Sequence, residues 1–459
     1  MPASNQGIID NINCKLTTGG LTDQQAAQLA GAAQALSCST VLSVACCSLL
    51  PSAASNKGRF VYLQDIGDFR YSNGSIWTDN YCSAKYLPNL WTWGGNSSGQ
   101  LGDGTTTSRR SPGTVAGGGL NWCQISARTY YSAIPSAAAI KSDGTLWTWG
   151  INLYGQLGDG TTTNRSSPGT VAGGGTNWCF VEVGADFYVY MVALKTDGTL
   201  WTWGCNGSGQ LGDGTTTNRS SPGTVAGGGT NWCAVSAGSR FTAAIKTDGT
   251  LWTWGYNAMG QLGNETTTGR SSPGTVAGGG TNWRSISAGH YHATAIKNDG
   301  TLWTWGRGAG GGLGDGTSFG RSSPGTTAGG GSNWCAVSAG SATSAAIKTD
   351  GTLWTWGENA RGELGDGTTT CRTSPGTVAG GGTNWCAISA GYRISAGIKT
   401  DGTLWTWGGN GYGQLGDGTI TSRSSPGTTI GGIINGSSSW SKVSTGGTMT
   451  FGLVVPAGF

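Results

Sequence analysis

LWTWGCNGSGQLGDGTTTNRSSPGTVAGGGTNWCAVSAGSRFTAAIKTDGT, residues 200–250, is one copy of a unit that recurs along this chain. Its first five residues, LWTWG, occur seven times, with spacings of 56 and 54 residues and then 51 residues four times. A fixed period of about fifty residues marks a closed propeller or a solenoid. The first tryptophans of the seven copies are Trp91, Trp147, Trp201, Trp252, Trp303, Trp354 and Trp405.

Each unit contains three segments that read as strands, which we call A, B and C. In one copy they are Cys233–Ala237, Thr242–Lys246 and Thr250–Trp254. Asp-Gly between B and C is a strong hairpin signal, and Pro in the later Ser-Ser-Pro-Gly-Thr-Val segment suits an outer edge strand, D. Four short strands per unit make a propeller blade, and seven units fall within the usual range of blades. We therefore predict an all-β fold, a seven-bladed β-propeller.

The two tryptophans of each pentapeptide have a predicted structural role. Because side chains alternate along a strand, Trp201 and Trp203 lie on one face and Thr202 on the other. A tryptophan buries about 150–250 Å². We expect both indoles to fill the wedge between blades as core, rather than to stack on a ligand.

The two ends of the repeat region are incomplete in complementary ways. Leu90–Gly94 has no A and B segments before it, and the last copy is followed by Trp440–Gly446 and Phe451–Val455, which read as A and B without a C. We predict that Leu90–Trp93 pairs with Phe451–Val455. The seventh blade would then be built from both ends of the chain, which leaves no open sheet edge between blades.

Composition excludes several classes of protein. Gly makes up 87 of 459 residues without a triplet period, and 22 Trp with 10% charged residues indicate a packed chain. The net charge of +4 is scattered, so no nucleic-acid partner is expected, and no stretch is apolar enough for membrane insertion. Five cysteines share one repeat position, and we expect them to be small buried hydrophobes rather than disulfides: Cys123, Cys179, Cys233, Cys335 and Cys386.

The recurring pattern Ala-Ile-Lys-x-Asp-Gly-Thr-Leu-Trp-Thr-Trp-Gly-x-Asn-x-x-Gly-Gln-Leu-Gly resembles the repeats of the regulator of chromosome condensation family. The resemblance covers roughly residues 89–459 and implies a seven-bladed propeller. It implies little about function, because the family includes exchange factors, ligase modules, kinases and undefined bacterial and viral proteins. The founding member activates a nuclear GTPase and binds chromatin, but this chain lacks the basic arm and the charged loops that such partners require. Its uniform repeats are similar to the variety seen in bacteria and their viruses.

The first 88 residues divide into two expected parts. Residues 53–88, with Ser72-Asn-Gly74 as a hairpin turn, are similar to a small β module of bacteriophage tail-fibre and other virion proteins. Residues 1–52 are expected to be a helical attachment or oligomerisation segment, with a capping-box start at Thr22 and a helix over Gln24–Leu36. By analogy with fibres we expect a homotrimer through this helix. The alternative is an ordinary amphipathic helix packed on the propeller.

Catalytic chemistry is hard to find in this sequence. His290 and His292 are its only histidines, and a lone His-x-His pair is a weak metal site. Two recurring Asp series, represented by Asp197 and Asp213, are expected to be turn residues rather than calcium ligands. The recurring Arg series, represented by Arg219, is expected to be scaffold that stacks on Trp or pairs with backbone carbonyls. We predict no enzyme activity, no metal and no cofactor.

The positions at which the repeats differ are the candidate binding residues. They fall in the A–B turn and just after strand C, and because strands alternate in direction these positions share one face of the ring. Aromatic and arginine side chains are enriched there, as they are in binding hot spots, although neutral drift in permissive loops is the alternative. The predicted receptor-binding residues are Tyr130, Tyr131, Tyr154, Phe187, Tyr188, Tyr190, Arg240, Phe241, Tyr256, His290, Tyr291, His292, Tyr392, Arg393 and Tyr412.

Together these features lead to a hypothesis about function. We predict a non-enzymatic structural protein of a bacteriophage virion, a tail fibre, spike or similar appendage, whose propeller head binds a host cell-surface glycan or protein. Residues 1–88 would attach it to other virion proteins, and the protein would be exposed on the particle after assembly in the host cytoplasm. The alternatives are an intracellular bacterial protein-interaction scaffold and, less favoured, a guanine-nucleotide-exchange-like regulator.

Overall fold

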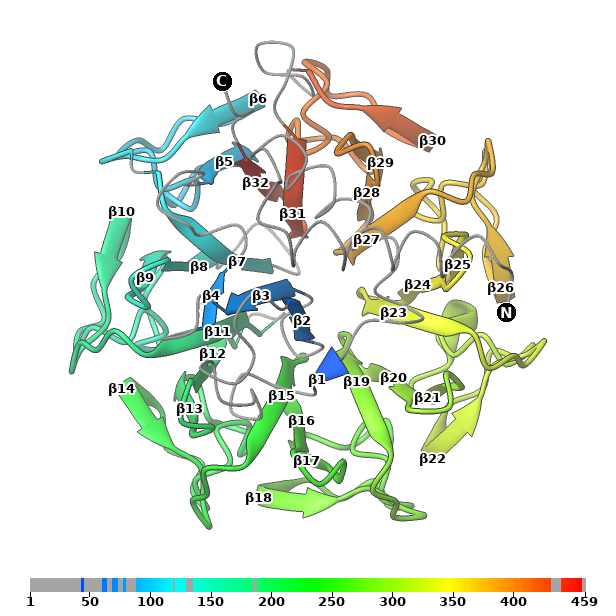
Figure 1. Ribbon diagram of the computed structural model, residues 1–459, viewed down its shortest axis with the longest axis horizontal. Helices are drawn as coiled ribbons and strands as arrows, with labels where there is room; N and C mark the ends of the chain where they lie inside the picture. The colour runs from blue at the N-terminus through cyan, green and yellow to red at the C-terminus, as the bar shows by residue number, and fades with distance from the viewer. Residues whose placement is uncertain are drawn as a thin grey trace.

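A computed structural model describes residues 88–118, 120–128, 135–184, 188–430 and 439–455, together with four short strands nearer the N-terminus. Seven four-stranded sheets form a ring of blades, with strand A of each blade at the centre and strand D at the rim (Figure 1). The predicted fold class is confirmed. We number the blades along the chain, and blade 7 contains strands from both ends.

Each blade consists of its strands A, B, C and D, in that order from the centre to the rim. Blade 1 consists of β7 (Trp122–Arg128), β8 (Ser136–Lys141), β9 (Leu146–Gly150) and β10 (Arg165–Thr170). Blade 2 consists of β11 (Trp178–Val183), β12 (Tyr190–Lys195), β13 (Leu200–Gly204) and β14 (Arg219–Thr224). Blade 3 consists of β15 (Trp232–Ala237), β16 (Phe241–Lys246), β17 (Leu251–Gly255) and β18 (Arg270–Thr275). Blade 4 consists of β19 (Trp283–Ala288), β20 (His292–Lys297), β21 (Leu302–Gly306) and β22 (Arg321–Thr326). Blade 5 consists of β23 (Trp334–Ala339), β24 (Thr343–Lys348), β25 (Leu353–Gly357) and β26 (Arg372–Thr377). Blade 6 consists of β27 (Trp385–Ala390), β28 (Ile394–Lys399), β29 (Leu404–Gly408) and β30 (Arg423–Thr428). Blade 7 consists of β31 (Ser439–Thr445), β32 (Met449–Val455), β5 (Asn89–Gly94) and β6 (Arg109–Thr114). A short 3-10 helix, η3 (Ala309–Gly311), lies in the C–D loop of blade 4.

Blade 7 closes the ring as the sequence predicts. Strand β32 pairs antiparallel with β5, with Leu453 opposite Leu90 and Thr450 opposite Trp93, and β31 and β6 complete the sheet. Phe451 stacks on Trp149 of blade 1, with ring centroids 5.8 Å apart and planes 8° from parallel. The two ends of the repeat region are therefore joined by backbone hydrogen bonds and by core packing.

The two tryptophans of each pentapeptide lie at different depths. Trp254 is fully buried between blades, whereas Trp252 is half-buried. A third tryptophan, Trp232 at the start of strand A, packs edge-on against both, with ring centroids 6.2 Å from Trp252 and 6.0 Å from Trp254. The ammonium of Lys246 lies 4.2 Å from the centroid of Trp252 and covers it by a cation–π contact. The prediction that both indoles belong to the core is therefore right for the second tryptophan, Trp254, and only partly right for the first, Trp252, which is half-buried.

The fully buried tryptophans link each blade to the one before it. Trp254 donates its indole N–H to the backbone carbonyl of Gln210 at 2.9 Å, and Gln210 lies in the C–D loop of blade 2. All seven blades repeat this bond, so the blades form a closed ring of indole-to-carbonyl hydrogen bonds. The other six donors are Trp93, Trp149, Trp203, Trp305, Trp356 and Trp407.

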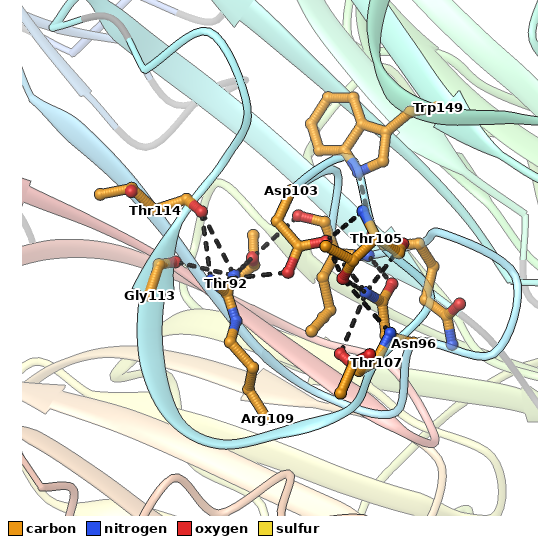
Figure 2. A network of polar contacts seen from close by, with 11 residues as sticks. Thr92, Asn96, Asp103, Thr105, Thr107, Arg109, Gly113, Thr114 and Trp149 are labelled. Carbon is orange, nitrogen blue, oxygen red and sulfur yellow. Dashed lines mark hydrogen bonds and ion pairs between the residues drawn. The ribbon is translucent and has the colours of Figure 1, made fainter.

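The C–D loop that carries this carbonyl is held by a buried asparagine, shown for blade 7 in Figure 2. Asn96 donates from its side-chain amide to Asp103, to Thr105 and to the carbonyl of Thr107, and its amide oxygen accepts the backbone N–H of Leu101 at 2.9 Å. The repeated Asn of the sequence motif therefore shapes the loop that receives the indole N–H of the next blade.

The two Asp series act as turn residues, which confirms the prediction for the described copies. Oδ1 of Asp213 accepts the backbone N–H and the hydroxyl of Thr215, and its other oxygen lies 3.2 Å from Arg219. Burial works against ionisation of Asp213, but these hydrogen bonds and the charge of Arg219 outweigh it and lower its pKa. The carboxylate partner of the Arg series was missed from the sequence. In blade 3, where Asn264 replaces Asp, Arg270 bonds to the carbonyls of Thr253, Gly274 and Thr275 instead.

The shared cysteine position gives a mixed outcome. Cys123, Cys179 and Cys386 carry free thiols, Cys233 is buried, and burial raises the pKa of Cys386 to about 12, as expected for inert hydrophobic cysteines. Cys335, by contrast, is disulfide-bonded. The prediction that these cysteines form no disulfides is therefore wrong for Cys335.

The N-terminal region contains a small four-stranded sheet. Its strands are β1 (Ser43–Val44), β2 (Phe60–Leu63), β3 (Asp68–Ser72) and β4 (Trp77–Asp79), in that order across the sheet. Ser72 pairs with Trp77 in the antiparallel β3–β4 ladder, and the residues between them, which include most of the predicted Ser-Asn-Gly turn, lie outside the described residues. The helix predicted over Gln24–Leu36 lies outside the described residues, so the division into residues 1–52, 53–88 and 89–459 stays a prediction.

Candidate functional site

The A–B turns and the C–D loops share one face of the ring, and backbone hydrogen bonds hold them together. In blade 3 the N–H of Tyr256 in the C–D loop donates to the carbonyl of Arg240 in the A–B turn at 2.8 Å. Neighbouring turns are also joined, since the N–H of His290 in blade 4 donates to the carbonyl of Gly340 in blade 5 at 3.1 Å. This face therefore presents its variable side chains on a preorganised backbone.

Three of the predicted surface residues are buried and belong to the scaffold. Tyr190 is 1% exposed, Phe241 0% and His292 1%. The Tyr190 hydroxyl donates to the carbonyl of Phe241 in the next blade and accepts from Thr242 at 3.1 Å, and His292 Nε2 lies 2.9 Å from the Ser344 hydroxyl of blade 5. These residues begin strand B, and the adjoining blade covers their side chains. Their assignment to a receptor-binding surface is corrected.

The remaining candidates fall into three groups. Tyr130, Tyr131 and Phe187 lie outside the described residues. Of the rest, His290 is 5% exposed, so its assignment to the surface is corrected as well. Eight are half-buried or exposed on the face: Tyr154, Tyr188, Arg240, Tyr256, Tyr291, Tyr392, Arg393 and Tyr412.

Five of these side chains form a continuous series, which we call the aromatic arc: Tyr154, Tyr188, Arg240, Tyr256 and Tyr291. Tyr154 and Tyr188 have ring centroids 6.1 Å apart, and the Arg240 guanidinium lies 3.8 Å from the centroid of Tyr188. Arg240 is also 6.0 Å from Tyr256, whose ring is 6.1 Å from that of Tyr291. The arc runs from the C–D loop of blade 1 to the A–B turn of blade 4.

The backbone at Arg240 is unusual and holds the side chain in the arc. Its φ of 57° lies in the left-handed region, which only glycine adopts without a steric cost. Arg393 of blade 6 has the same feature, with a φ of 59°, but its guanidinium contacts Tyr392 of its own turn, 4.9 Å from the ring centroid. Arg240 and Arg393 thus occupy equivalent turns, and of these two only Arg240 joins the rings of different blades among the contacts of the described residues.

Two exposed apolar side chains lie close in the chain to members of the arc. Leu153 precedes Tyr154 and is 58% exposed, and Met259 lies three residues after Tyr256 and is 45% exposed. Aromatic rings, an arginine and exposed aliphatic side chains on a rigid frame are the composition of a protein-binding surface. The sequence indicated the face but not the arc, because residues such as Tyr154 and Tyr188 become neighbours only through the seam between blades.

A buried carboxylate on the same face was missed from the sequence. Glu363 is 3% exposed and occupies the position held by Gln in most repeats, and its side chain accepts the N–H of Arg361 at 2.7 Å. Burial raises the pKa of Glu363, which the hydrogen bond and the charge of Arg393 only partly offset, while the nearby charge of Glu358 adds to the rise. A comparison of the repeats, in which Glu replaces a buried Gln once, could have found it.

We predict that Glu363→Gln stabilises the protein at neutral pH. Because the folded state raises the pKa of Glu363 above its ordinary value of 4.5, the folded state holds this proton more tightly, and the free energy of unfolding falls as pH rises through that window. The variant should melt at a higher temperature than the original chain at pH 7 and at the same temperature at pH 4. The reverse exchange in blade 2, Gln210→Glu, should lower the melting temperature at pH 7 only. Equal shifts at both pH values would contradict this account.

Neither a metal centre nor a membrane span is found in the described residues. No group of three or more His, Cys, Asp or Glu side chains is placed there to hold a metal ion. Among the helices of that same part of the chain, none has the length and apolarity needed to cross a membrane. The aromatic arc supplies ring faces and a cation, which suit binding.

Comparison with known proteins shows which family profiles and which relatives the repeats match. A family profile described as an RCC1-like domain matches residues 188–455, and the profile of the RCC1 (regulator of chromosome condensation) repeat matches residues 89–134 and 143–191. The ultraviolet-B receptor UVR8 of Arabidopsis thaliana is 29% identical over 340 residues, which cover 73% of this chain and 76% of UVR8. The E3 ubiquitin-protein ligase HERC2 of Homo sapiens is 31% identical over 299 residues, 63% of this chain but 6% of HERC2.

Solved structures show the same architecture. Prp20p of Saccharomyces cerevisiae superimposes with a TM-score of 0.69 at 18% identity, over 82% of this chain and 92% of Prp20p. Human WBSCR16 gives a TM-score of 0.67 at 19% identity, over 80% of this chain and 98% of that protein. At such low identities these likenesses establish the fold alone.

These relatives also bear on the predicted function. UVR8 and HERC2, from a plant and from human, favour a protein-interaction or regulatory role. They give no support to the tail-fibre hypothesis, so the virion location, the attachment through residues 1–88 and the host receptor stay predictions of the sequence. Mass spectrometry of purified virus particles would test them.

Proposed function

Since this chain belongs to the RCC1-like domain family of propellers, we propose that it is a non-enzymatic interaction protein that binds another protein through the aromatic arc. The observation that carries the proposal is the arc itself, which joins side chains of blades 1 to 4 in one series on an otherwise uniform ring. The core pentapeptide is the same in every blade, and the arc is where the blades differ.

The relatives support a binding role without identifying the partner. Prp20p was characterised for its binding to Gsp1p and histones, and HERC2 is a ubiquitin ligase of which this chain matches a small part. The arc of this chain suits a protein surface because its rings contact one another and Arg240, which reduces the side-chain entropy lost on binding. Tyrosine and arginine are also enriched in binding hot spots.

Site-specific photo-crosslinking tests this function in the full-length protein. A photoreactive residue is placed at Met259, in the same C–D loop as Tyr256, or at Tyr412, which holds the same repeat position in blade 6 and is equally exposed, 46% against 45%. We expect a discrete protein adduct from position 259 and none from position 412 in extracts of the source cell. The adduct should fall by about 10- to 30-fold when Arg240 is changed to Gly, as loss of an anchor worth about 2 kcal/mol implies.

Arg393, in the equivalent turn of blade 6, supplies a matched control for Arg240. Arg393→Gly removes an arginine from an equivalent left-handed turn outside the arc, so it should leave the adduct from position 259 unchanged. Identical adducts from both positions would mean that the whole face, rather than the arc, binds. Failure to obtain any adduct above background from position 259 would reject the proposed function.

A further inference from the structure

The seam between blades 5 and 6 brings two exposed arginines together on the face that also carries the arc. Arg361 lies in the C–D loop of blade 5, and Arg393 lies in the A–B turn of blade 6. Both side chains begin beside Gly409 of blade 6, because a Cβ placed on this glycine would be 3.8 Å from the Cβ of Arg361 and 3.7 Å from the Cβ of Arg393. The two arginines therefore leave the backbone as neighbours, although they belong to different blades.

Neither arginine is part of the repeated scaffold. Arg393 has a φ of 59°, in the left-handed region where a side chain has a steric cost and glycine has none, and such positions are frequent in ligand-binding turns. Arg361 occupies a repeat position that holds no charged residue in the other six units. The residues at that position there are Ser98, Tyr154, Ser208, Met259, Gly310 and Tyr412.

The positive charge of this arginine pair is not cancelled by an ion pair. In the part of the chain that the structure describes, no carboxylate pairs with the guanidinium of Arg361 or of Arg393, and Arg393 contacts the ring of Tyr392 instead, 4.9 Å from its centroid. The arginines of the scaffold differ in this respect, since Arg423 lies 2.9 Å from Asp417. The pair at the seam thus has its charge available to a ligand.

Two acidic residues of the Arg361 loop have other positions. The side chain of Glu358 lies against Gly310 of blade 4, where a Cβ on that glycine would be 2.6 Å from its Cγ. Glu363 is 3% exposed and accepts the backbone N–H of Arg361. The charges of Glu363 and Arg393 act on each other, so Glu363 opposes the binding of an anion without occupying the surface.

Two neighbouring guanidinium groups select both the charge and the shape of a ligand. Each is a planar fork of N–H donors with no acceptor. A phosphate monoester has three terminal oxygens and about two negative charges at pH 7, so it can accept hydrogen bonds from both forks at once. A dianion also offsets the repulsion between two like charges on neighbouring side chains.

We propose that Arg361 and Arg393 bind the phosphate group of a small phosphate monoester at the seam between blades 5 and 6. This site is separate from the aromatic arc, which lies over blades 1 to 4, and it goes beyond the proposed function. The ligand is a small molecule, because two arginines that share Gly409 as a neighbour supply contacts for one phosphate group. A phosphorylated segment of a protein is the competing source of the same group.

The test is a phosphorus-31 NMR titration of methyl phosphate with the full-length protein. We expect a saturable shift and broadening of the signal, with a dissociation constant of about 1 mM or tighter. Dimethyl phosphate, which has a single negative charge and two terminal oxygens, should bind at least about tenfold more weakly. A phosphoserine tripeptide should bind within about threefold of methyl phosphate, because the two arginines contact only the phosphate group.

Four variants identify the residues responsible. Arg361→Gln and Arg393→Gly should each weaken the binding of methyl phosphate by at least about tenfold, as loss of charge-assisted hydrogen bonds implies. Arg393→Gly should retain the original melting temperature, because glycine is favoured at a φ of 59°. Arg240→Gly, in the equivalent turn of blade 3, is the matched control and should leave binding within about twofold of the original. Glu363→Gln should tighten binding by about two- to threefold at neutral pH, since it removes a negative charge that acts on Arg393.

Three results would overturn the inference. They are the absence of binding at up to about 10 mM methyl phosphate, unchanged binding in both Arg361→Gln and Arg393→Gly, and an equal loss in Arg240→Gly. A phosphoserine tripeptide that binds more than about tenfold more tightly than methyl phosphate would overturn the small-molecule assignment in favour of a protein segment. The crosslink expected from Met259 is independent of all these results, so failure of this inference and failure of the proposed function are distinguishable.

Discussion

Changing Trp254 to Ala is expected to lower the free energy of unfolding by about 3–5 kcal/mol. The indole is fully buried between blades 2 and 3, packs on Trp232 with centroids 6.0 Å apart, and donates to the carbonyl of Gln210 at 2.9 Å. The substitution removes the packing, leaves a cavity and breaks one link of the ring of indole-to-carbonyl bonds. Urea denaturation followed by tryptophan fluorescence and circular dichroism would measure the loss.

The same pentapeptide supplies the control. Trp252→Ala removes the same side chain two residues away, but Trp252 is half-buried and its outer contact is the cation–π interaction with Lys246 at 4.2 Å. We expect a loss of about 1–2 kcal/mol, from partial burial and one exposed cation–π contact. Equal losses for the two variants would show that the depth of each indole in the wedge does not govern stability.

Deleting the chain from Met449 onward is expected to abolish cooperative folding of the propeller. Strand β32 lies between β31 and β5, so its loss separates the strands from the two ends of the chain. The deletion also removes the buried Met449, Phe451 and Leu453 from the core shared with Trp149 of blade 1. The opened ring would expose unpaired strand edges, which promote aggregation. Size-exclusion chromatography and near-ultraviolet circular dichroism would detect the change.

A circular permutant provides the matched control for the deletion. In it the chain begins at Ser439, Leu453 is joined to Leu90 through a copy of the Lys246–Thr250 turn, and the chain ends at Ile430. Leu453 pairs with Leu90 as Ile245 pairs with Leu251, so the borrowed turn has the length that this hairpin needs. We expect the permutant to fold cooperatively. A folded deletion variant, or a permutant that fails to fold, would contradict the role given to closure by β32.

Much of the fold follows from the sequence because each blade repeats local signals. The Asp-Gly turn and the alternation of apolar residues locate strands B and C, and the incomplete first and last units predict the pairing of Leu90 with Leu453. The copies of the Asp motif likewise form their turns from neighbouring residues, as Asp213 does with Thr215. Short-range hydrogen bonding suffices for these features, so one repeat unit contains the information for them.

The site was only partly predictable, because it depends on contacts between blades. The variable turns share one face of the ring, as the sequence predicts, yet Tyr190 and Phe241 were assigned to the surface and are buried, while the pairing of Arg219 with Asp213 was missed. Period-two alternation identifies the face of a strand on which a side chain lies. It does not show how deeply that side chain is buried between two neighbouring blades.

The sequence by itself therefore determined the blade, the number of blades, the closure of the ring and the face on which the repeats differ. Only the tertiary structure decided which side chains of that face are exposed and that Tyr154, Tyr188, Arg240, Tyr256 and Tyr291 form one series. The physical reason is that strands and turns are set by hydrogen bonds and side-chain alternation within one unit, whereas burial and stacking are set by the neighbouring blade, which contributes residues remote in the chain.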